Sequence, residues 1–395
     1  MENNELTTFR AETSAWLEAN CPESMRQPIT DDSESYWGGR KATFISDDQK
    51  AWFEAMKEKQ WLVPQWPKEY GGGGLSKAEN KILEQEMKRL KCRRPLTSFG
   101  VSMLGPALLK FGNEEQKKEH LSKITSGEIR WCQGYSEPGA GSDLASLQTK
   151  AEDKGDHYLV NGQKVWTSYG DQSDWIFCLV RTDFEAKKHH GISFLLIDMA
   201  TEGVSTRPIK LISGKSPFCE TFLDNVKVPK ENLVGIRNQG WTIAKYLLTH
   251  EREMIGTLFG SINTTPVHKL AVEAIGTENG KLTDTALRAD IARWSMDEAA
   301  FKLTLARVVD EFKAGQSLGA ASSTLKYYGT ELNKSRLELM LAVDGFNGLS
   351  WEGEASKNGQ LARGFCRSKG NSIEGGTSEV QLNIIAKRIL GLPSR

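Results

Sequence analysis

The sequence has no long apolar run, no excess charge of one sign and no cysteine cluster. No stretch approaches the ~20 apolar residues that a membrane-spanning helix needs. Its 51 basic and 51 acidic residues give a formal net charge of +0, so no overall field attracts nucleic acid or an anionic membrane surface. The six cysteines are scattered, with no Cys-x-x-Cys pair and no histidine at metal-ligand spacing. We therefore expect buried thiols and no metal site.

The first residues, Met1 to Ser14, are polar and include acidic side chains. They lack the apolar core of a signal peptide and the Arg-rich, acid-poor character of a transit peptide. Hydrophobic residues make up 38% of the chain and charged residues 26%, which is ordinary globular composition. With 395 residues, two or three packed domains are expected. These features predict a cytoplasmic protein that can bury a large cofactor.

The pattern of apolar residues changes twice along the chain. Residues 1–130 show apolar spacings of three, four and seven, residues 131–236 contain short β-rich runs, and residues 237–395 are again helical in period. The pattern predicts a mostly α fold with an inserted β domain. Because strands and helices do not alternate and no Gly-x-Gly-x-x-Gly opens a strand-to-helix turn, a Rossmann nucleotide site is not expected. Expected strands are 158–160, 165–166, 175–180, 192–197 and 220–228, and expected C-terminal helices are 241–259, 283–314, 320–341 and 379–390.

One pair of residues in the β-rich part is typical of a tight turn. Asn161-Gly162 separates His157–Val160 from Gln163–Trp166. Asn-Gly accepts the positive φ values of a type I′ turn, so the sequence predicts a β-hairpin centred on this pair.

Two segments are rich in residues that can present backbone N–H groups to a phosphate. Tyr135-Ser136-Glu137-Pro138-Gly139-Ala140-Gly141-Ser142-Asp143 could offer its N–H groups and the Ser142 hydroxyl. Gly375-Gly376-Thr377-Ser378 precedes an apolar helix, whose unpaired N–H groups form an anion site. The alternatives are a plain turn for the first segment and a bare helix cap for the second.

The segment 135–143 resembles the first signature of the acyl-CoA dehydrogenases, and Trp166-Thr167-Ser168 follows at the distance that this family uses. Phe111–Gln116, Pro67–Gly74 and Gly376–Gln381 also resemble the family, so the similarity spans nearly the whole chain. The glycines of the Pro67–Gly74 segment predict a flexible break between helices. The resemblance implies an N-terminal helical domain, a middle β-barrel-like domain, a C-terminal four-helix bundle, and FAD between the β domain and the bundle.

The resemblance also implies FAD-binding residues at both segments. Those that line the flavin ring or reach the pyrophosphate are Gln133, Tyr135, Ser136, Gly141, Ser142, Trp166 and Ser168. Trp166 is implied to stack near the ring, Ser168 to donate a hydrogen bond to its reactive nitrogen, and Ser142 to contact pyrophosphate and substrate. The ordinary alternative for Trp166 is a core strand residue. At the second segment, the far half of FAD is implied to contact Thr377 and Glu379, the latter standing where glutamine is more usual.

The implied reaction is FAD-dependent α,β-dehydrogenation of an acyl-CoA thioester to the trans-2-enoyl-CoA. It needs a carboxylate to remove the α proton while hydride leaves the β carbon. Many family members carry this glutamate directly before the Gly-Thr of the C-terminal motif, where this chain has Gly375, with Glu374 one residue earlier. A second family position, on the first long C-terminal helix, matches Glu251, which precedes Arg252.

Helical periodicity supports Glu251 without the resemblance. Ile243, Leu247, Met254 and Leu258 form an apolar stripe on which Glu251 falls. A carboxylate on a buried face is costly unless it is paired or functional, and partial burial raises its pKa toward neutrality, which suits a general base. The alternatives are an ion pair with Arg252 or another cation and a base at Glu374. Arg252 is expected to hold the helix or a coenzyme A phosphate.

Two family features are missing: an Arg-x-x-Phe-Gly stretch and a Gln-Ile-x-Gly-Gly-x-Gly motif, whose place is taken by Ala342–Gly348. In the family these segments lie at the dimer interface, which puts cross-subunit flavin contacts in question. The expected assembly is a homodimer or homotetramer, and an electron-transfer flavoprotein is the expected electron acceptor. The alternatives are an FAD-binding subunit of a heterotetramer, a non-catalytic acyl-CoA-binding homologue, and a flavin oxidase or monooxygenase on the same scaffold.

Overall fold

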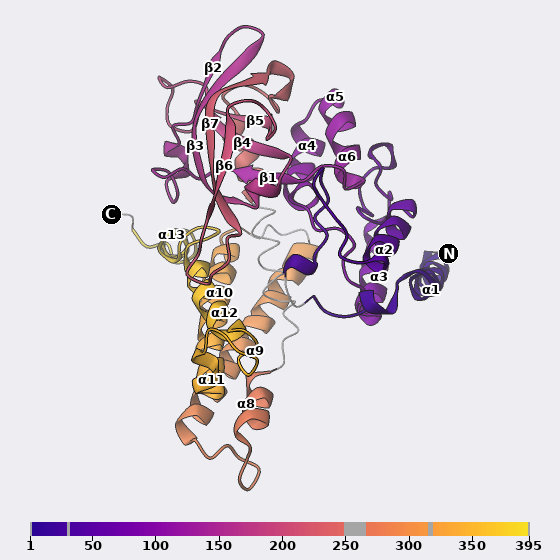
Figure 1. Cartoon of the computed structure of the whole chain (residues 1–395), viewed down its shortest axis with the longest axis vertical. Helices are drawn as coiled ribbons and strands as arrows, with labels where there is room; N and C mark the ends of the chain where they lie inside the picture. Colours follow the sequence, from indigo (N-terminus) through magenta and orange to yellow (C-terminus); the bar gives the residue numbers. More distant parts are fainter. Residues whose placement is uncertain (1, 30–31, 249–265, 315–318, 394–395) are drawn as a thin grey trace. The chain divides into compact units, whose positions relative to one another are not determined.

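The computed structural model describes residues 2–29, 32–248, 266–314 and 319–393. It divides into two compact units (Figure 1). Unit 1 comprises Met1–Ile209 and Pro217–Leu247, and unit 2 comprises Lys210–Ser216 and Leu248–Arg395. Each unit has its own apolar core.

The first part of unit 1 is helical, as the apolar spacing predicts. Its helices are α1 (Glu2–Asn20), α2 (Asp47–Glu58), α3 (Lys77–Arg89), α4 (Gly105–Phe111), α5 (Glu114–Gln116) and α6 (Ser122–Thr125). Ser46 caps α2, and Ser76 with Glu79 forms a capping box at the start of α3. The apolar faces of α1 and α2 bury Leu17 and Trp52 in one core.

The glycine run between α2 and α3, predicted as a flexible break, is a packed turn instead. A Cβ atom at Gly72 would lie 2.3 Å from the carbonyl oxygen of Trp66. At Gly71, with φ of +84°, a Cβ would lie 2.4 Å from Thr125 Oγ1. Glycine is needed here because chain segments approach closely.

The rest of unit 1 is built on one seven-stranded sheet. The strands are β1 (Trp131–Gly134), β2 (Lys150–Asp153), β3 (His157–Ser168), β4 (Trp175–Arg181), β5 (Ile192–Asp198), β6 (Val204–Ile209) and β7 (Phe218–Pro229). Their order is β1-β4-β2-β3-β7-β6, with β5 paired to β4. β1 runs parallel to β4, and Trp131 lies opposite Trp175. Each of the five expected strand runs lies in a strand, whereas β1, β2 and β6 were not anticipated.

The hairpin predicted at Asn161-Gly162 is wrong. β3 continues through both residues as one strand of 12 residues, and the β2–β3 turn lies earlier, at Gly155. The register between β3 and β7 shifts between Val160 and Gly162. A Cβ at Gly162 would lie 2.5 Å from Thr149 Oγ1, so this glycine serves a bulge and a close approach.

Unit 2 is helical. Its helices are α8 (Val267–Ile275), α9 (Thr285–Lys313), α10 (Ala321–Asp344), α11 (Phe346–Leu349), α12 (Gln360–Ser368) and α13 (Ser378–Ile384). The helix that precedes them starts at residue 240 and is described to residue 248, and it belongs to unit 1 up to Leu247. α10 packs against α8, α9, α12 and α13, and Figure 1 shows α9, α10 and α12 side by side. The Trp294 indole N–H donates to the Leu332 carbonyl, joining α9 to α10 at 3.0 Å.

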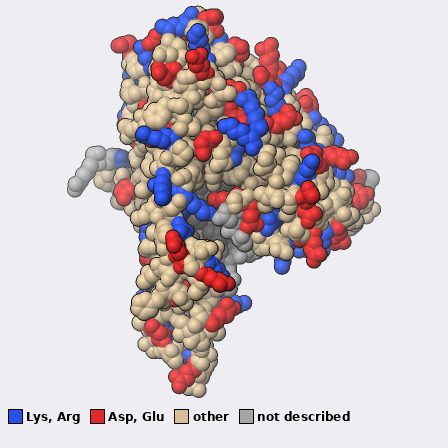
Figure 2. All heavy atoms as spheres, in the orientation of Figure 1, with Lys and Arg blue, Asp and Glu red and all other residues tan. Residues whose placement is uncertain are grey.

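The predicted fold class is therefore confirmed: helices, then a β domain, then helices. The exact boundaries after residues 130 and 236 stay predictions. Within the described ranges, every helix is too short or too polar to cross a membrane. On the face drawn in Figure 2, basic and acidic side chains are interspersed, in keeping with the balanced charge of the sequence.

Candidate functional site

The loop from Tyr135 to Asp143 is held in shape by its own backbone. The N–H groups of Glu137 and Ala140 each donate to the other's carbonyl at 3.0 Å. The Val165 N–H donates to the Ser136 carbonyl at 2.9 Å, which brings the start of the loop beside β3. A Cβ at Gly139 or Gly141 would meet nothing within 4 Å. One side of the loop is therefore open to a ligand, and exposed Ser142 belongs to this rim.

Two side chains of the segment entering this loop are placed for a buried ligand. Gln133 on β1 has a buried Nε2 that finds no hydrogen-bond partner among the described residues. A buried donor of this kind costs free energy unless something accepts from it. Tyr135 is buried, and its ring packs edge-on against Phe177 and Phe194, with centroids 6.0 and 6.4 Å away.

Trp166 lies at an irregular point of β3 rather than in the core. Its φ is +61°, a value that side-chain-bearing residues rarely adopt, and the β3–β7 register shifts between Lys164 and Thr167. The bulge leaves the Trp166 side chain 53% exposed, with its ring 6.0 Å from that of Phe218. Ser168 ends β3 opposite Phe218. Strained backbone of this kind clusters at ligand sites.

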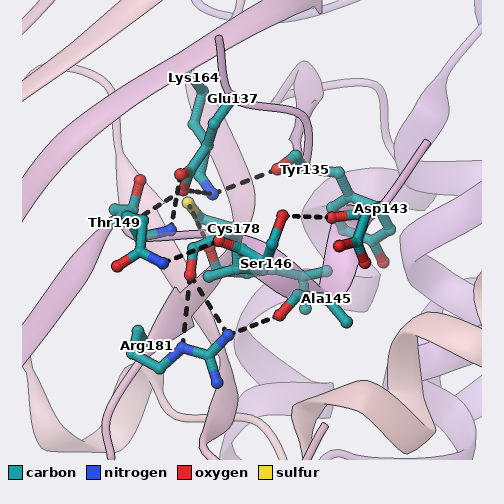
Figure 3. A network of polar contacts seen from close by, with 12 residues as sticks. Tyr135, Glu137, Asp143, Ala145, Ser146, Thr149, Lys164, Cys178 and Arg181 are labelled. Atoms are coloured by element: carbon teal, nitrogen blue, oxygen red, sulfur yellow. Dashed lines mark hydrogen bonds and ion pairs between the residues drawn. The ribbon is translucent and has the colours of Figure 1, made fainter. Parts of the chain in front are cut away.

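A buried ion pair between Glu137 and Lys164 anchors the loop (Figure 3). Lys164 Nζ lies 2.8 Å from Glu137 Oε1 and donates to the Tyr135 carbonyl at 3.2 Å. Glu137 also accepts from the N–H groups of Gln148 and Thr149, at 2.6 and 2.8 Å. Burial by itself raises the pKa of Glu137, but the Lys164 ammonium and these hydrogen bonds outweigh it and hold the pKa below its usual value. Sequence reasoning missed this pair.

Arg181 at the end of β4 fixes the chain that follows the loop. Its guanidinium donates to the carbonyls of Ala145 and Leu147, at 2.6 and 3.3 Å, and to that of Lys188 at 2.7 Å. Lys188 in turn pairs with Asp143. Each of these hydrogen bonds from Arg181 goes to a backbone carbonyl oxygen. Burial lowers the pKa of this guanidinium.

The second segment, in unit 2, is a helix start. Thr377 is the N-cap of α13, and its hydroxyl accepts from the Val380 N–H at 3.2 Å. Gly375 and Gly376 have φ of +66° and +92°. Glu379 is exposed in the first turn, where hydrogen bonds from its own backbone N–H and from Thr377 lower its pKa. The expected helix start is thus present, with Thr377 at its N-cap and Glu379 in its first turn, and its role as an anion site stays a prediction.

Of the two candidate bases, Glu374 lies within the described residues and Glu251 does not. Glu251 and Arg252 lie outside the described residues, although Ile243 and Leu247 of the predicted stripe are buried at 2% and 0% exposure. Glu374 is exposed, 2.8 Å from the Arg367 guanidinium, and accepts from the Asn371 amide at 2.5 Å. These contacts use both carboxylate oxygens of Glu374 in a surface network.

Comparison with known proteins decides the family. Sequence models of the acyl-CoA dehydrogenase N-terminal, middle and C-terminal domains match residues 9–128, 132–226 and 238–390. IpdE1 of Mycolicibacterium smegmatis, named an acyl-CoA dehydrogenase, is 33% identical over 98% of both chains. This chain belongs to the acyl-CoA dehydrogenase family.

Two further relatives refine the comparison. Acyl-CoA dehydrogenase FadE34 of Mycobacterium tuberculosis is 37% identical over 86% of this chain, but the match spans only 46% of that longer protein. The solved structure of the Tcur3481-Tcur3483 steroid ACAD is 31% identical and has a TM-score of 0.77 over 99% of this chain and 98% of that one. The fold of an acyl-CoA dehydrogenase is therefore present in full.

Dehydrogenases of this family are generally FAD-dependent, and the residues present fit that cofactor. The Gln133 donor without a partner, the open glycines of the 135–143 loop and the exposed Trp166 indole suit a flavin and its pyrophosphate. In unit 2, buried Gln381 donates to the Gly375 carbonyl at 3.0 Å, while its Oε1 finds no partner among the described residues. Both predicted segments thus keep polar groups available for a ligand.

A hollow in unit 1 was not anticipated from the sequence. It has a volume of about 550 Å³ and is lined by His189, His190, Asn238, Gln239, Trp241, Thr242 and Lys245. The rings of His189 and Trp241 lie 5.0 Å apart. His189 and His190 are both exposed, and they line the hollow together with the Trp241 indole and the Lys245 ammonium. Such a lining suits an aromatic ligand that carries phosphate.

Proposed function

We propose that this protein catalyses the FAD-dependent α,β-dehydrogenation of an acyl-CoA thioester to the trans-2-enoyl-CoA. The observation that carries the proposal is the anchored 135–143 loop, open at Gly139 and Gly141, beside the unpaired donor of Gln133. When bound, FAD supplies the acceptor for the hydride that leaves the β carbon. The family's general dependence on FAD supports this assignment.

The protein's own residues orient the reactants and move the proton. Glu251 takes the α proton, because Glu374 is tied to Arg367 and Asn371 and residue 375 is glycine. Ser142 and Gly141 hold phosphate, and Trp166 with Ser168 borders the reacting ring. Thr377 and Glu379 receive the far half of the cofactor. Arg252 contacts the coenzyme A portion of the thioester.

The surroundings of the reaction follow from the same proposal. An electron-transfer flavoprotein takes up the electrons, the protein acts in the cytoplasm, and the chain forms a homodimer or homotetramer. Because a similar solved structure is named a steroid ACAD, steroid-derived thioesters belong among the substrates to be tried, with straight-chain, branched and dicarboxylic ones. The experiment is turnover with a dye as electron acceptor, read by mass spectrometry of the coenzyme A product. A product lighter by two hydrogen atoms supports the proposal, and an unchanged thioester across the whole panel counts against it.

A second candidate function is that of an FAD-binding subunit in a heteromeric dehydrogenase. Gly375 stands where many family members carry the base, and the similar steroid ACAD is named for two components, Tcur3481 and Tcur3483. Light scattering and activity of the purified chain separate the two cases. A chain that oligomerises alone and turns over is complete, whereas a chain that gains activity only with a sister subunit is a partner.

A further inference from the structure

The loop that receives the cofactor in the proposed function has apolar support at Tyr135 and Ala140, which are 5% and 2% exposed, and little elsewhere. Gly139 and Gly141 face open space, and Ser142 is exposed. A loop with few packed side chains keeps one conformation only if polar contacts fix it. Besides the backbone hydrogen bonds within the loop, two buried side-chain groups do so: the Glu137 carboxylate and the Lys164 ammonium.

These two groups fasten the loop at both ends. Lys164 Nζ reaches the Tyr135 carbonyl, where the loop begins. Glu137 reaches the N–H groups of Gln148 and Thr149, where the chain turns into β2. Figure 3 shows the Lys164 ammonium beside the Glu137 carboxylate, with the ammonium also reaching Tyr135 and the carboxylate also reaching Thr149. The segment between Tyr135 and Thr149 is therefore held at both ends.

Stability alone is a weak reason for this arrangement. The side chains of Lys164 and Glu137 are 0% and 7% exposed. Removing two charges from water is costly, and well-packed apolar residues often serve stability as well as a buried ion pair does. What a buried ion pair adds is a preferred geometry, since a buried charge that loses its hydrogen-bond partners when the loop moves is strongly destabilised.

We propose that the Glu137–Lys164 pair is a positioning device that holds the Tyr135–Ser142 loop in its FAD-binding shape before the cofactor arrives. The inference rests on the proposed function, in which this loop holds FAD. A loop that is already ordered spares the ordering cost on binding, so the pair acts on cofactor affinity. Neither residue needs to touch FAD.

The test compares two buried glutamates of unit 1. Glu137→Gln removes the ion pair between this loop residue and Lys164. Glu86→Gln is the matched control, since Glu86 on α3 is also buried and pairs with Arg10 and Arg89 at 2.6 Å. Both variants lower the melting temperature of the apoprotein. We expect Glu137→Gln to weaken FAD binding, measured by flavin fluorescence, by about tenfold or more, while Glu86→Gln leaves FAD affinity within about twofold of wild type.

Equal FAD affinity in the two variants overturns the inference, because the pair is then structural only. If Glu137→Gln does not fold, the double variant Glu137→Gln with Lys164→Met, which leaves no buried charge, takes its place. Amide exchange of the wild-type apoprotein tests the same idea directly: the N–H groups of Gln148 and Thr149 must be protected without FAD, and exchange at unfolded-chain rates contradicts preordering. A wild-type protein that does not bind FAD at all refutes the proposed function instead.

Discussion

The two segments proposed to hold FAD meet one chemical demand in different ways. In unit 1 the 135–143 loop is fixed by an ion pair whose side chains are 0% and 7% exposed. In unit 2 the start of α13 is fixed by an N-cap, while the neighbouring Arg367–Glu374 pair is 37% and 43% exposed. An exposed pair contributes only about 0–1 kcal/mol, whereas breaking a buried one costs several. Shape is therefore built into unit 1 more firmly than into unit 2.

Cofactor binding and proton removal are assigned to different residues. Substitutions of two glutamates test this assignment with the largest expected effect. Glu251→Gln keeps the shape of the side chain but removes the proposed base, so turnover falls by about a hundredfold or more while FAD remains bound. Glu374→Gln disturbs only the surface network of unit 2 and leaves turnover within about twofold. Steady-state kinetics and the flavin content of both variants give the answer. Near-normal activity of Glu251→Gln moves the base to Glu374.

Arg181 tests the buried anchoring of unit 1. Arg181→Met removes the donors that serve the carbonyls of Ala145, Leu147 and Lys188 and leaves those acceptors without the guanidinium. We expect a loss of about 2 kcal/mol or more in the free energy of unfolding, measured by denaturant titration. Arg367→Met, the matched change at the partly exposed pair in unit 2, is expected to cost less than about 1 kcal/mol. Equal losses would remove the contrast between the units.

One hydroxyl from each segment compares their roles in binding. Ser142→Ala removes a phosphate contact and weakens FAD binding by about 1 kcal/mol, with little change in melting temperature because Ser142 is exposed. Thr377→Ala also removes the N-cap of α13, so it lowers the stability of unit 2 by about 1 kcal/mol in addition to any effect on FAD. Fluorescence titration and thermal unfolding of the apoproteins separate the two readouts. Unchanged FAD affinity in Ser142→Ala would reject its assignment.

The smallest expected effect is a pH dependence in unit 1. His120 is 2% exposed between the rings of Trp131 and Trp175, and burial lowers its pKa from the ordinary 6.5. The unfolded chain then binds a proton that the folded chain refuses, so this stabilising contribution is complete well above pH 6.5 and is lost as pH falls toward the folded pKa. Between pH 7.5 and 6 the loss is at most about 0.8 kcal/mol. His120→Phe should flatten the pH dependence of thermal unfolding, and an unchanged slope would contradict this origin.

The sequence predicts the order of helical and β-rich parts well, because apolar periodicity reports which face of each element is buried. It fails at Asn161-Gly162, whose composition is that of a hairpin turn. The glycine is required by the close approach of Thr149, which lies 13 residues earlier in the chain, and a local turn signal does not report that contact. The bulge that exposes Trp166 could not be predicted from the sequence for the same reason, because the register of β3 depends on its pairing with β7.

The candidate ligand segments were found from their residues and the family resemblance, but their supports were not. Glu137, Lys164 and Arg181 are far apart in sequence and meet only in the folded sheet. One signal was available. Lys164 falls in phase with the buried strand positions Tyr158 and Val160, and a charged residue in such a phase predicts a buried partner. The identity of that partner depends on tertiary structure.

The most direct measurement is the visible spectrum of the purified protein, recorded after incubation with FAD and during anaerobic titration with acyl-CoA thioesters. We predict a yellow protein whose flavin absorption is bleached by at least one thioester of the panel. A protein that remains colourless and takes up no FAD would contradict the central claim.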